Sequence, residues 1–207
     1  MKHNDAETPP IAPRLRLIVC LAALTVAFIG AWPQPVAATD DIVPPDVPDN
    51  IAVPAGHKVF LKGHAIGTQN YMCLPDGANT PTWMLIGPQA TLFDDDEKQI
   101  ITHFLSPNPD QNGVPRATWQ HSRDTSTVWA LQIQSAPVAL EDIPWLLLQV
   151  VGVEPGPTGG KRLMKTTYIQ RLNTSGGVAP LPSCTVGQRA FEQYTADYFF
   201  YKATTRE

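Results

Sequence analysis

Residues 194–202 read YTADYFFYK, and this stretch decides the fold class. The side chains alternate strictly: Tyr198 and Phe200 fall on one side, Phe199 and Tyr201 on the other. A period of two residues is typical of a β-strand. Because aromatic rings occupy both sides, we expect this strand to lie inside a sheet and to be covered on both faces.

The same alternation recurs along the chain, and it predicts an all-β domain. About nine short strands separated by turn signals predict a single-domain antiparallel β-sandwich, with a closed or partly open β-barrel as the alternative. Residues 143–153 are almost continuously apolar, which fits a fully buried strand or a core helix, and Pro144 and Gly152 favour the strand. Two short helices are predicted, over residues 135–142 and 186–193.

The N-terminal segment has the three parts of a secretion signal. Arg14 and Arg16 precede an apolar run over residues 17–29, and Val36-Ala37-Ala38 supplies the small residues for cleavage. The apolar run is shorter than the roughly 20 residues of a spanning helix, so we predict a signal peptide over 1–38, with a retained anchor as the alternative. We therefore expect a secreted or periplasmic protein with no stable membrane insertion after cleavage.

The remainder of the chain divides into two parts. Residues 39–54 contain four prolines and predict an extended linker, and residues 55–207 form the predicted β-domain. The formal net charge is −4 and no basic run occurs, so the sequence predicts no nucleic-acid partner. It contains no cofactor motif and no metal-ligand spacing, so we expect neither a cofactor nor a metal. The oligomeric state does not follow from the sequence.

The cysteines indicate one disulfide. Three are present, and Cys20 lies inside the predicted signal peptide. Cys73 and Cys184 remain, an even pair in an oxidising compartment with no neighbouring cysteine to form a metal-binding motif. We therefore predict a structural Cys73–Cys184 bond.

Several short motifs, in order along the chain, resemble one family of exported proteins. The motifs are Asn70-Tyr71-Met72-Cys73, Gly87-Pro88-Gln89-Ala90-Thr91-Leu92, Ala117-Thr118-Trp119, Ile143-Pro144-Trp145-Leu146-Leu147-Leu148, Ile169-Gln170-Arg171-Leu172-Asn173-Thr174 and Tyr194-Thr195-Ala196-Asp197-Tyr198. Over residues 59–201 the chain resembles DUF3455, a domain of unknown function. The resemblance implies an exported single domain without an established activity. One departure lies at Asp124-Thr125-Ser126, where threonine replaces the glycine of the family pattern and puts the usual tight turn in doubt.

Four side chains are candidates for a binding site. His103 lies on an otherwise apolar strand face, Trp119 lies beside a polar loop and is expected to be exposed, and Asp124 is in that loop. Arg171, on a late strand, is expected to form a salt bridge with Asp197 or Asp124.

These candidates support three hypotheses for function. The leading one is a non-enzymatic extracytoplasmic domain that binds a small molecule or glycan near His103, Trp119 and Asp124. The second is a secreted hydrolase that uses His103 and Asp124 as acid and base, although no catalytic motif is present. The third is a structural protein of the envelope or cell surface, which predicts a large apolar patch and no pocket.

Overall fold

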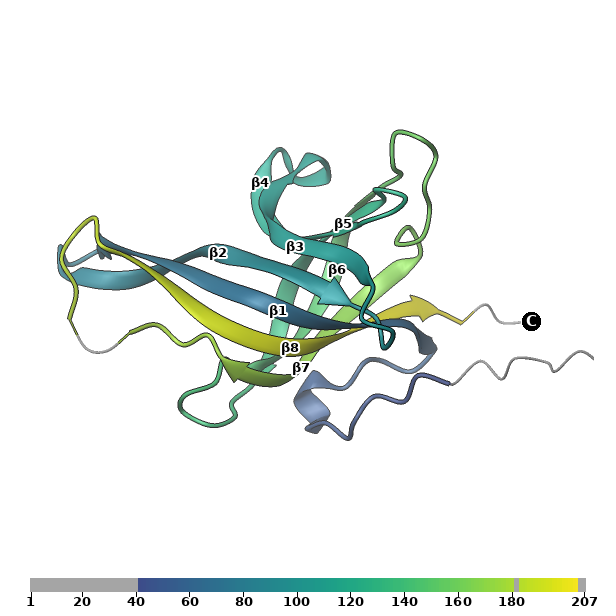
Figure 1. The fold of residues 1–207 in the computed structure, drawn as a ribbon, viewed down its shortest axis with the longest axis horizontal. Helices are drawn as coiled ribbons and strands as arrows, with labels where there is room; N and C mark the ends of the chain where they lie inside the picture. The colour runs from purple at the N-terminus through teal and green to yellow at the C-terminus, as the bar shows by residue number, and fades with distance from the viewer. Residues whose placement is uncertain (1–40, 181–182, 205–207) are drawn as a thin grey trace, which may run out of the picture. The chain divides into compact units, whose positions relative to one another are not determined.

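The computed structural model describes residues 41–180 and 183–204, and these form a closed eight-stranded antiparallel β-barrel (Figure 1). The strands are β1 (His57–Pro75), β2 (Pro81–Phe93), β3 (Gln99–Asn108), β4 (Val114–His121), β5 (Thr127–Ala136), β6 (Trp145–Glu154), β7 (Thr166–Gly176) and β8 (Arg189–Ala203). Each strand pairs with the next along the chain. β8 then pairs with β1, from His57 opposite Ala203 to Met72 opposite Arg189, and this pairing closes the barrel.

The closed barrel corrects the predicted sandwich and confirms the alternative. Strands of a sandwich and of a barrel have the same period of two residues, so the pattern alone does not separate them. The two architectures differ in whether the first strand pairs with the last. That pairing joins segments at opposite ends of the domain.

Both predicted helices are wrong, and the described residues contain no α-helix; only two short 3-10 helices occur, Asp49–Ile51 (η1) and Pro109–Gln111 (η2). The segment predicted over 135–142 instead ends β5 and forms a turn, in which the Asp142 N–H donates to the Ala139 carbonyl at 3.1 Å. The segment predicted over 186–193 enters β8 at Arg189. Segments of two turns or fewer are too short to offset the cost of helix nucleation, whereas sheet pairing satisfies their backbone groups.

Alternate residues of each strand point into the barrel. On β8, Tyr198 and Phe200 join the main core, together with Trp119, Ile101 and Leu92. β1 contributes small residues to this interior. A Cβ atom on Gly67 would lie 2.2 Å from the Gln89 carbonyl oxygen, so β1 and β2 approach too closely there for any side chain.

The segment before the barrel, residues 41–53, packs against the outer surface of the sheet. Ile51 is 0% exposed and belongs to a second apolar cluster with Leu147, Leu172, Phe199 and Tyr201. The Gln170 side-chain amide donates to the Ile51 carbonyl at 2.7 Å. These contacts explain the aromatic rings on both sides of β8, because Phe199 and Tyr201 face this segment. They also differ from the linker predicted over 39–54: prolines keep the segment extended, but Ile51 is buried and Ile42, Val47 and Val53 are partly buried against the barrel.

Replacing Ile51 with alanine is expected to lower the free energy of unfolding by about 2–4 kcal/mol, because a fully buried side chain is truncated. Urea unfolding followed by circular dichroism measures the change. Val43→Ala is the matched control, since Val43 lies in the same segment but is 81% exposed; a change of less than about 0.5 kcal/mol is expected there. Equal effects of the two substitutions would show that the segment does not pack on the barrel.

Beyond the barrel, β1, β2 and β8 continue as a three-stranded extension, which we call the arm (Figure 1). It comprises residues 70–75, 81–87 and 189–193. Within the described pairing, β2 meets β3 only from Ala90 to Phe93, and β7 meets β8 only up to Gly176 opposite Tyr194. The arm strands therefore pair with one another and leave the barrel wall.

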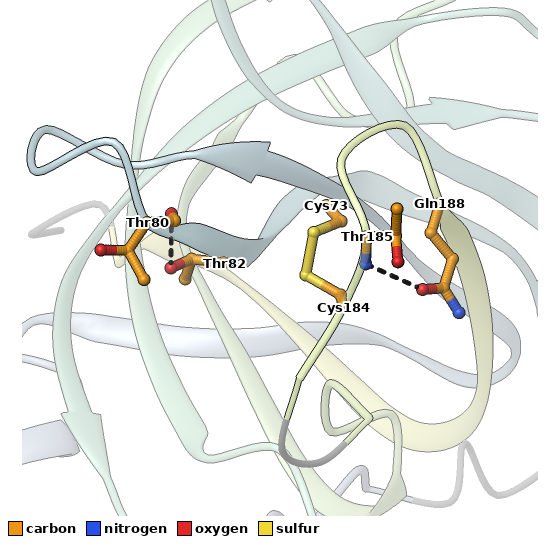
Figure 2. The surroundings of a disulfide bond; sticks show 6 residues. All are labelled: Cys73, Thr80, Thr82, Cys184, Thr185 and Gln188. Atoms are coloured by element: carbon orange, nitrogen blue, oxygen red, sulfur yellow. Dashed lines mark hydrogen bonds between the residues drawn. A yellow bond between two sulfur atoms is a disulfide. The ribbon is translucent and has the colours of Figure 1, made fainter.

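The predicted disulfide is confirmed, and it lies in the arm. Cys73 on β1 is bonded to Cys184, with 5.9 Å between the Cα atoms and a sequence separation of 111 residues (Figure 2). Beside it, the Cys73 N–H donates to the Gln188 carbonyl at 2.8 Å, and the Gly187 N–H donates to the Cys73 carbonyl at 2.9 Å. The bond thus fixes the approach to β8 against β1.

The predicted signal peptide, residues 1–38, lies outside the described residues and stays a prediction. Within the described part of the chain, no helix is long and apolar enough to cross a membrane.

Candidate functional site

A cavity of about 410 Å³ opens at one end of the barrel, where β2 separates from β3. Its wall is mainly apolar and includes Leu85, Ile86, Pro88, Leu105, Leu131, Ile143, Leu146 and Leu148. Its polar groups come from the side chains of Gln69, Tyr71, His103, Arg116, Trp119, Gln132, Arg171 and Tyr198. An apolar pocket of ~300–1,000 Å³ with a few convergent polar groups is the usual form of a small-molecule site.

Three of the four predicted site residues line this cavity: His103, Trp119 and Arg171. The strand register brings the first two together, because His103 on β3 is directly opposite Trp119 on β4. Their rings stack with the centroids 4.2 Å apart, and Tyr198 of β8 packs against both. The predicted exposure of Trp119 is wrong: the side chain is 0% exposed, because its strand position faces the barrel interior.

His103 is a neutral hydrogen-bond acceptor fixed in one tautomer. Its Nδ1 lies 2.8 Å from the Thr118 carbonyl oxygen, which can only accept, so Nδ1 carries the hydrogen and Nε2 keeps the lone pair. Burial lowers the pKa of His103 to about 3, despite the opposing effect of the Thr118 bond, and the charge of Arg171 adds to the decrease. His103 therefore stays uncharged near neutral pH.

Trp119 has a buried indole N–H that lacks a hydrogen-bond partner. Within the described residues, only the indole N–H groups of Trp83 and Trp119 are buried side-chain polar groups without a hydrogen-bond partner. Of the two, Trp119 lines the cavity. A buried donor without a partner is unfavourable by about 1–3 kcal/mol.

Arg171 is held at the cavity wall by a backbone carbonyl. Its Nε and Nη2 donate to the Pro144 oxygen at 3.2 and 2.8 Å. The expected salt bridges are absent from the described residues, since Arg171 forms no ion pair with Asp197 or Asp124. Asp197 faces the opposite side of the sheet, where it contacts His64 at 2.6 Å.

The charge of Arg171 lowers the pKa values of two tyrosines that line the same cavity, Tyr198 and Tyr71. Burial raises the pKa of Tyr198, and the guanidinium offsets part of that increase. Burial also raises the pKa of Tyr71, the charge of Arg171 offsets part of that increase, and the charge of Glu192 adds to it. The Tyr71 hydroxyl donates to the Gly177 carbonyl at 2.8 Å. Arg171 therefore acts on the pKa of His103, Tyr71 and Tyr198 alike.

Asp124, the fourth predicted residue, does not reach the cavity. It organises the turn between β4 and β5, where its carboxylate accepts from the Ser126 hydroxyl at 2.7 Å and from the Arg162 N–H at 2.8 Å. Burial raises the pKa of Asp124, but these hydrogen bonds and the nearby His121 outweigh it and lower the pKa to about 2. The turn forms without the family glycine, with Thr125 in the left-handed region at φ 55°.

The acid and base residues of the hydrolase hypothesis, His103 and Asp124, form their hydrogen bonds with other partners. The Nδ1 of His103 binds a backbone carbonyl, and the carboxylate of Asp124 contacts His121, Ser126 and Arg162.

Among the described residues, no group of three or more His, Cys, Asp or Glu side chains is arranged to hold a metal ion. Gln69 is a cavity residue that the sequence interpretation missed, although it alternates in register with Tyr71. The alternation would have placed Gln69 on the same face as Tyr71, once β1 was known to continue through Gly67.

The comparison with protein families agrees with the resemblance in the sequence. A family model described as "Protein of unknown function (DUF3455)" matches residues 54–202. The chain belongs to the DUF3455 family. No curated protein and no solved structure matches it, so the family assignment brings no activity with it. In this DUF3455 protein, the stacked rings of His103 and Trp119 and the cation of Arg171 line the cavity, set in an apolar wall.

Proposed function

We propose that this protein is an extracytoplasmic binding domain that holds one small, largely apolar molecule in the open end of its barrel. The observation that carries the proposal is the cavity itself, whose mainly apolar wall also holds the Arg171 guanidinium. An eight-stranded barrel is wide enough to hold one small ligand.

The chemistry of the wall favours binding over catalysis. The side chains that line the cavity include no Ser, Thr, Cys, Lys, Asp or Glu. Its one imidazole has a pKa of about 3, so near neutral pH it accepts a hydrogen bond but has little tendency to take up a proton. These groups orient a molecule and supply neither a nucleophile nor a matched acid–base pair.

A glycan is less well matched to the site than a small apolar molecule. Sugar recognition uses the exposed face of an aromatic ring, and Trp119 is buried with His103 stacked on one face. The hypothesis of a purely structural protein predicts no pocket, so the cavity does not support it.

An extracytoplasmic location is supported by two features. Disulfides such as Cys73–Cys184 persist mainly in oxidising compartments. The predicted export signal over residues 1–38 points to the same location.

Binding is tested with N-phenyl-1-naphthylamine, a neutral dye whose fluorescence increases in an apolar environment. We expect saturable binding of one dye per chain. Ala117 lines the cavity, so Ala117→Phe places a ring in it and is expected to weaken binding by at least about tenfold, the scale of the apolar contact that is lost. Ala78→Phe is the matched control, because Ala78 lies in the exposed turn between β1 and β2, and its affinity should stay unchanged. Non-saturable binding, or equal affinity of the two variants, would contradict the proposal.

A further inference from the structure

Arg171 is a cation in a cavity wall that contains no acidic side chain. Building on the proposed function, we propose that the ligand is a small amphipathic carboxylate, with its carboxylate on the Arg171 guanidinium and its apolar part along the cavity wall.

The guanidinium is oriented before any ligand binds. Nε and Nη2 each donate to the Pro144 oxygen, at 3.2 and 2.8 Å, and so fix the plane of the group. A guanidinium has five N–H donors, so donors remain for a ligand beyond those that face Pro144 and the Tyr198 hydroxyl. Less conformational entropy is lost on binding when the group is already held in place.

No carboxylate neutralises this cation within the described part of the chain. The ion pairs there involve Lys62, His64, Lys98 and His121 as the basic partners. Two acidic residues near it along the strands are already engaged: Asp197 contacts His64, and Asp142 accepts from the Gly176 N–H at 2.6 Å. Glu192 acts on the neighbouring Tyr71, but it is outside the cavity lining and forms no ion pair with Arg171. A partly buried cation that lacks a counter-ion is stabilised by an anion that enters with the ligand.

Charge is segregated between the cavity and the rest of the protein. The chain as a whole carries a formal net charge of −4. The cavity wall instead holds two arginines, Arg116 and Arg171, and no acid. Such complementarity selects anionic ligands over neutral or cationic ones.

The rest of the wall suits an apolar tail. Leu105, Ile143, Leu146 and Leu148 line it without a charge. A cavity of about 410 Å³ lies near the small end of the range for ligand pockets, ~300–1,000 Å³, and favours a short molecule. Together these features describe a molecule with one acidic end and a compact apolar body.

The test compares octanoate with octanol, which share a chain length and differ in charge. Each displaces N-phenyl-1-naphthylamine from the full-length protein at pH 7.5, a pH ~3 units above the usual pKa of a carboxylic acid. We expect octanoate to bind at least about tenfold more tightly than octanol, although octanol is the more apolar of the two. In Arg171→Gln the affinity for octanoate should fall by about 10- to 100-fold, and that for octanol should change by less than about twofold.

Arg189→Gln is the matched control, because Arg189 is an exposed arginine in the arm and lies outside the cavity. It should leave both affinities unchanged. If Arg171→Gln does not fold, the salt dependence of binding to the unmodified protein tests the carboxylate assignment instead. Added sodium chloride should weaken octanoate binding and leave octanol binding unaffected.

The carboxylate assignment is overturned if octanol binds as tightly as octanoate, or if Arg171→Gln weakens both equally. In either case the dye still binds and the proposed function stands. Failure of the proposed function gives a different result, since the unmodified protein then binds neither the dye nor either compound.

Discussion

Removal of the disulfide is expected to lower the free energy of unfolding by about 3–5 kcal/mol. The Cys73–Cys184 bond spans 111 residues, and a cross-link that closes a loop of this length restricts the unfolded chain by about 4–5 kcal/mol in the chain-entropy model. For a domain of this size the midpoint of thermal unfolding should fall by roughly 10 °C or more. Urea unfolding of Cys73→Ser/Cys184→Ser, followed by circular dichroism, measures the loss.

Reductant supplies the control for this experiment. Reduced unmodified protein should lose the same free energy as the double variant, and the variant itself should be insensitive to reductant. Two free thiols in the native oxidised protein, or identical unfolding midpoints for the two proteins, would contradict the prediction. A smaller local effect is also expected at the cavity, because Tyr71 lies two residues from Cys73 on the same strand.

Acidification from pH 7.5 to 4.5 is expected to lower the free energy of unfolding by about 2–3 kcal/mol through His103 alone. Burial first, and the Arg171 charge in addition, lower the pKa of His103 in the folded protein to about 3, against an ordinary value of 6.5. Between these two values the unfolded chain binds one proton more than the folded protein. The stabilisation is therefore complete above pH 6.5 and is lost as the pH falls towards 3, at about 1.4 kcal/mol per pH unit.

The pH dependence of unfolding in His103→Gln isolates this contribution. The variant should show a shallower decrease in stability between pH 6.5 and 4.5 than the unmodified protein, whatever its stability at pH 7.5. Asp124 contributes in a separate range, because hydrogen bonds lower its pKa from 3.8 to about 2 and its stabilising effect is lost only below about pH 4. Equal slopes for the two proteins would contradict the assignment. So would an NMR titration in which the imidazole of His103 is protonated above pH 5.

The sequence predicted the strands and the disulfide, because both depend on local or simple signals. The strand over residues 194–202 is recognised from the side chains of that segment alone. The pairing of Cys73 with Cys184 follows from a count of the cysteines. The burial of residues 41–53 was missed, because four prolines dominate the pattern and conceal the apolar contacts of Ile51.

The candidate site was predicted in part for a related reason. His103, Trp119 and Arg171 occupy strand positions that alternation places on the inner face, so they meet once the barrel closes. Asp124 lies in a turn, and nothing in the pattern states at which end of the barrel a turn falls. The burial of Trp119 likewise depends on closure, because a position next to a polar loop is exposed on an open sheet and enclosed in a barrel.

The pairing of β1 with β8 has a consequence for how the protein folds. His57 faces Ala203 and Met72 faces Arg189, so the first strand, which pairs with β2 on one edge, finds the partner for its other edge only after the last strand has been synthesised. Contacts this distant in sequence slow folding, since the chain must close a long loop before they form. Until then that edge of β1 remains unpaired and can pair with other chains. Loss of β8 would therefore leave an open sheet with two unpaired edges in place of a smaller barrel, and it would remove the inner wall that carries Tyr198.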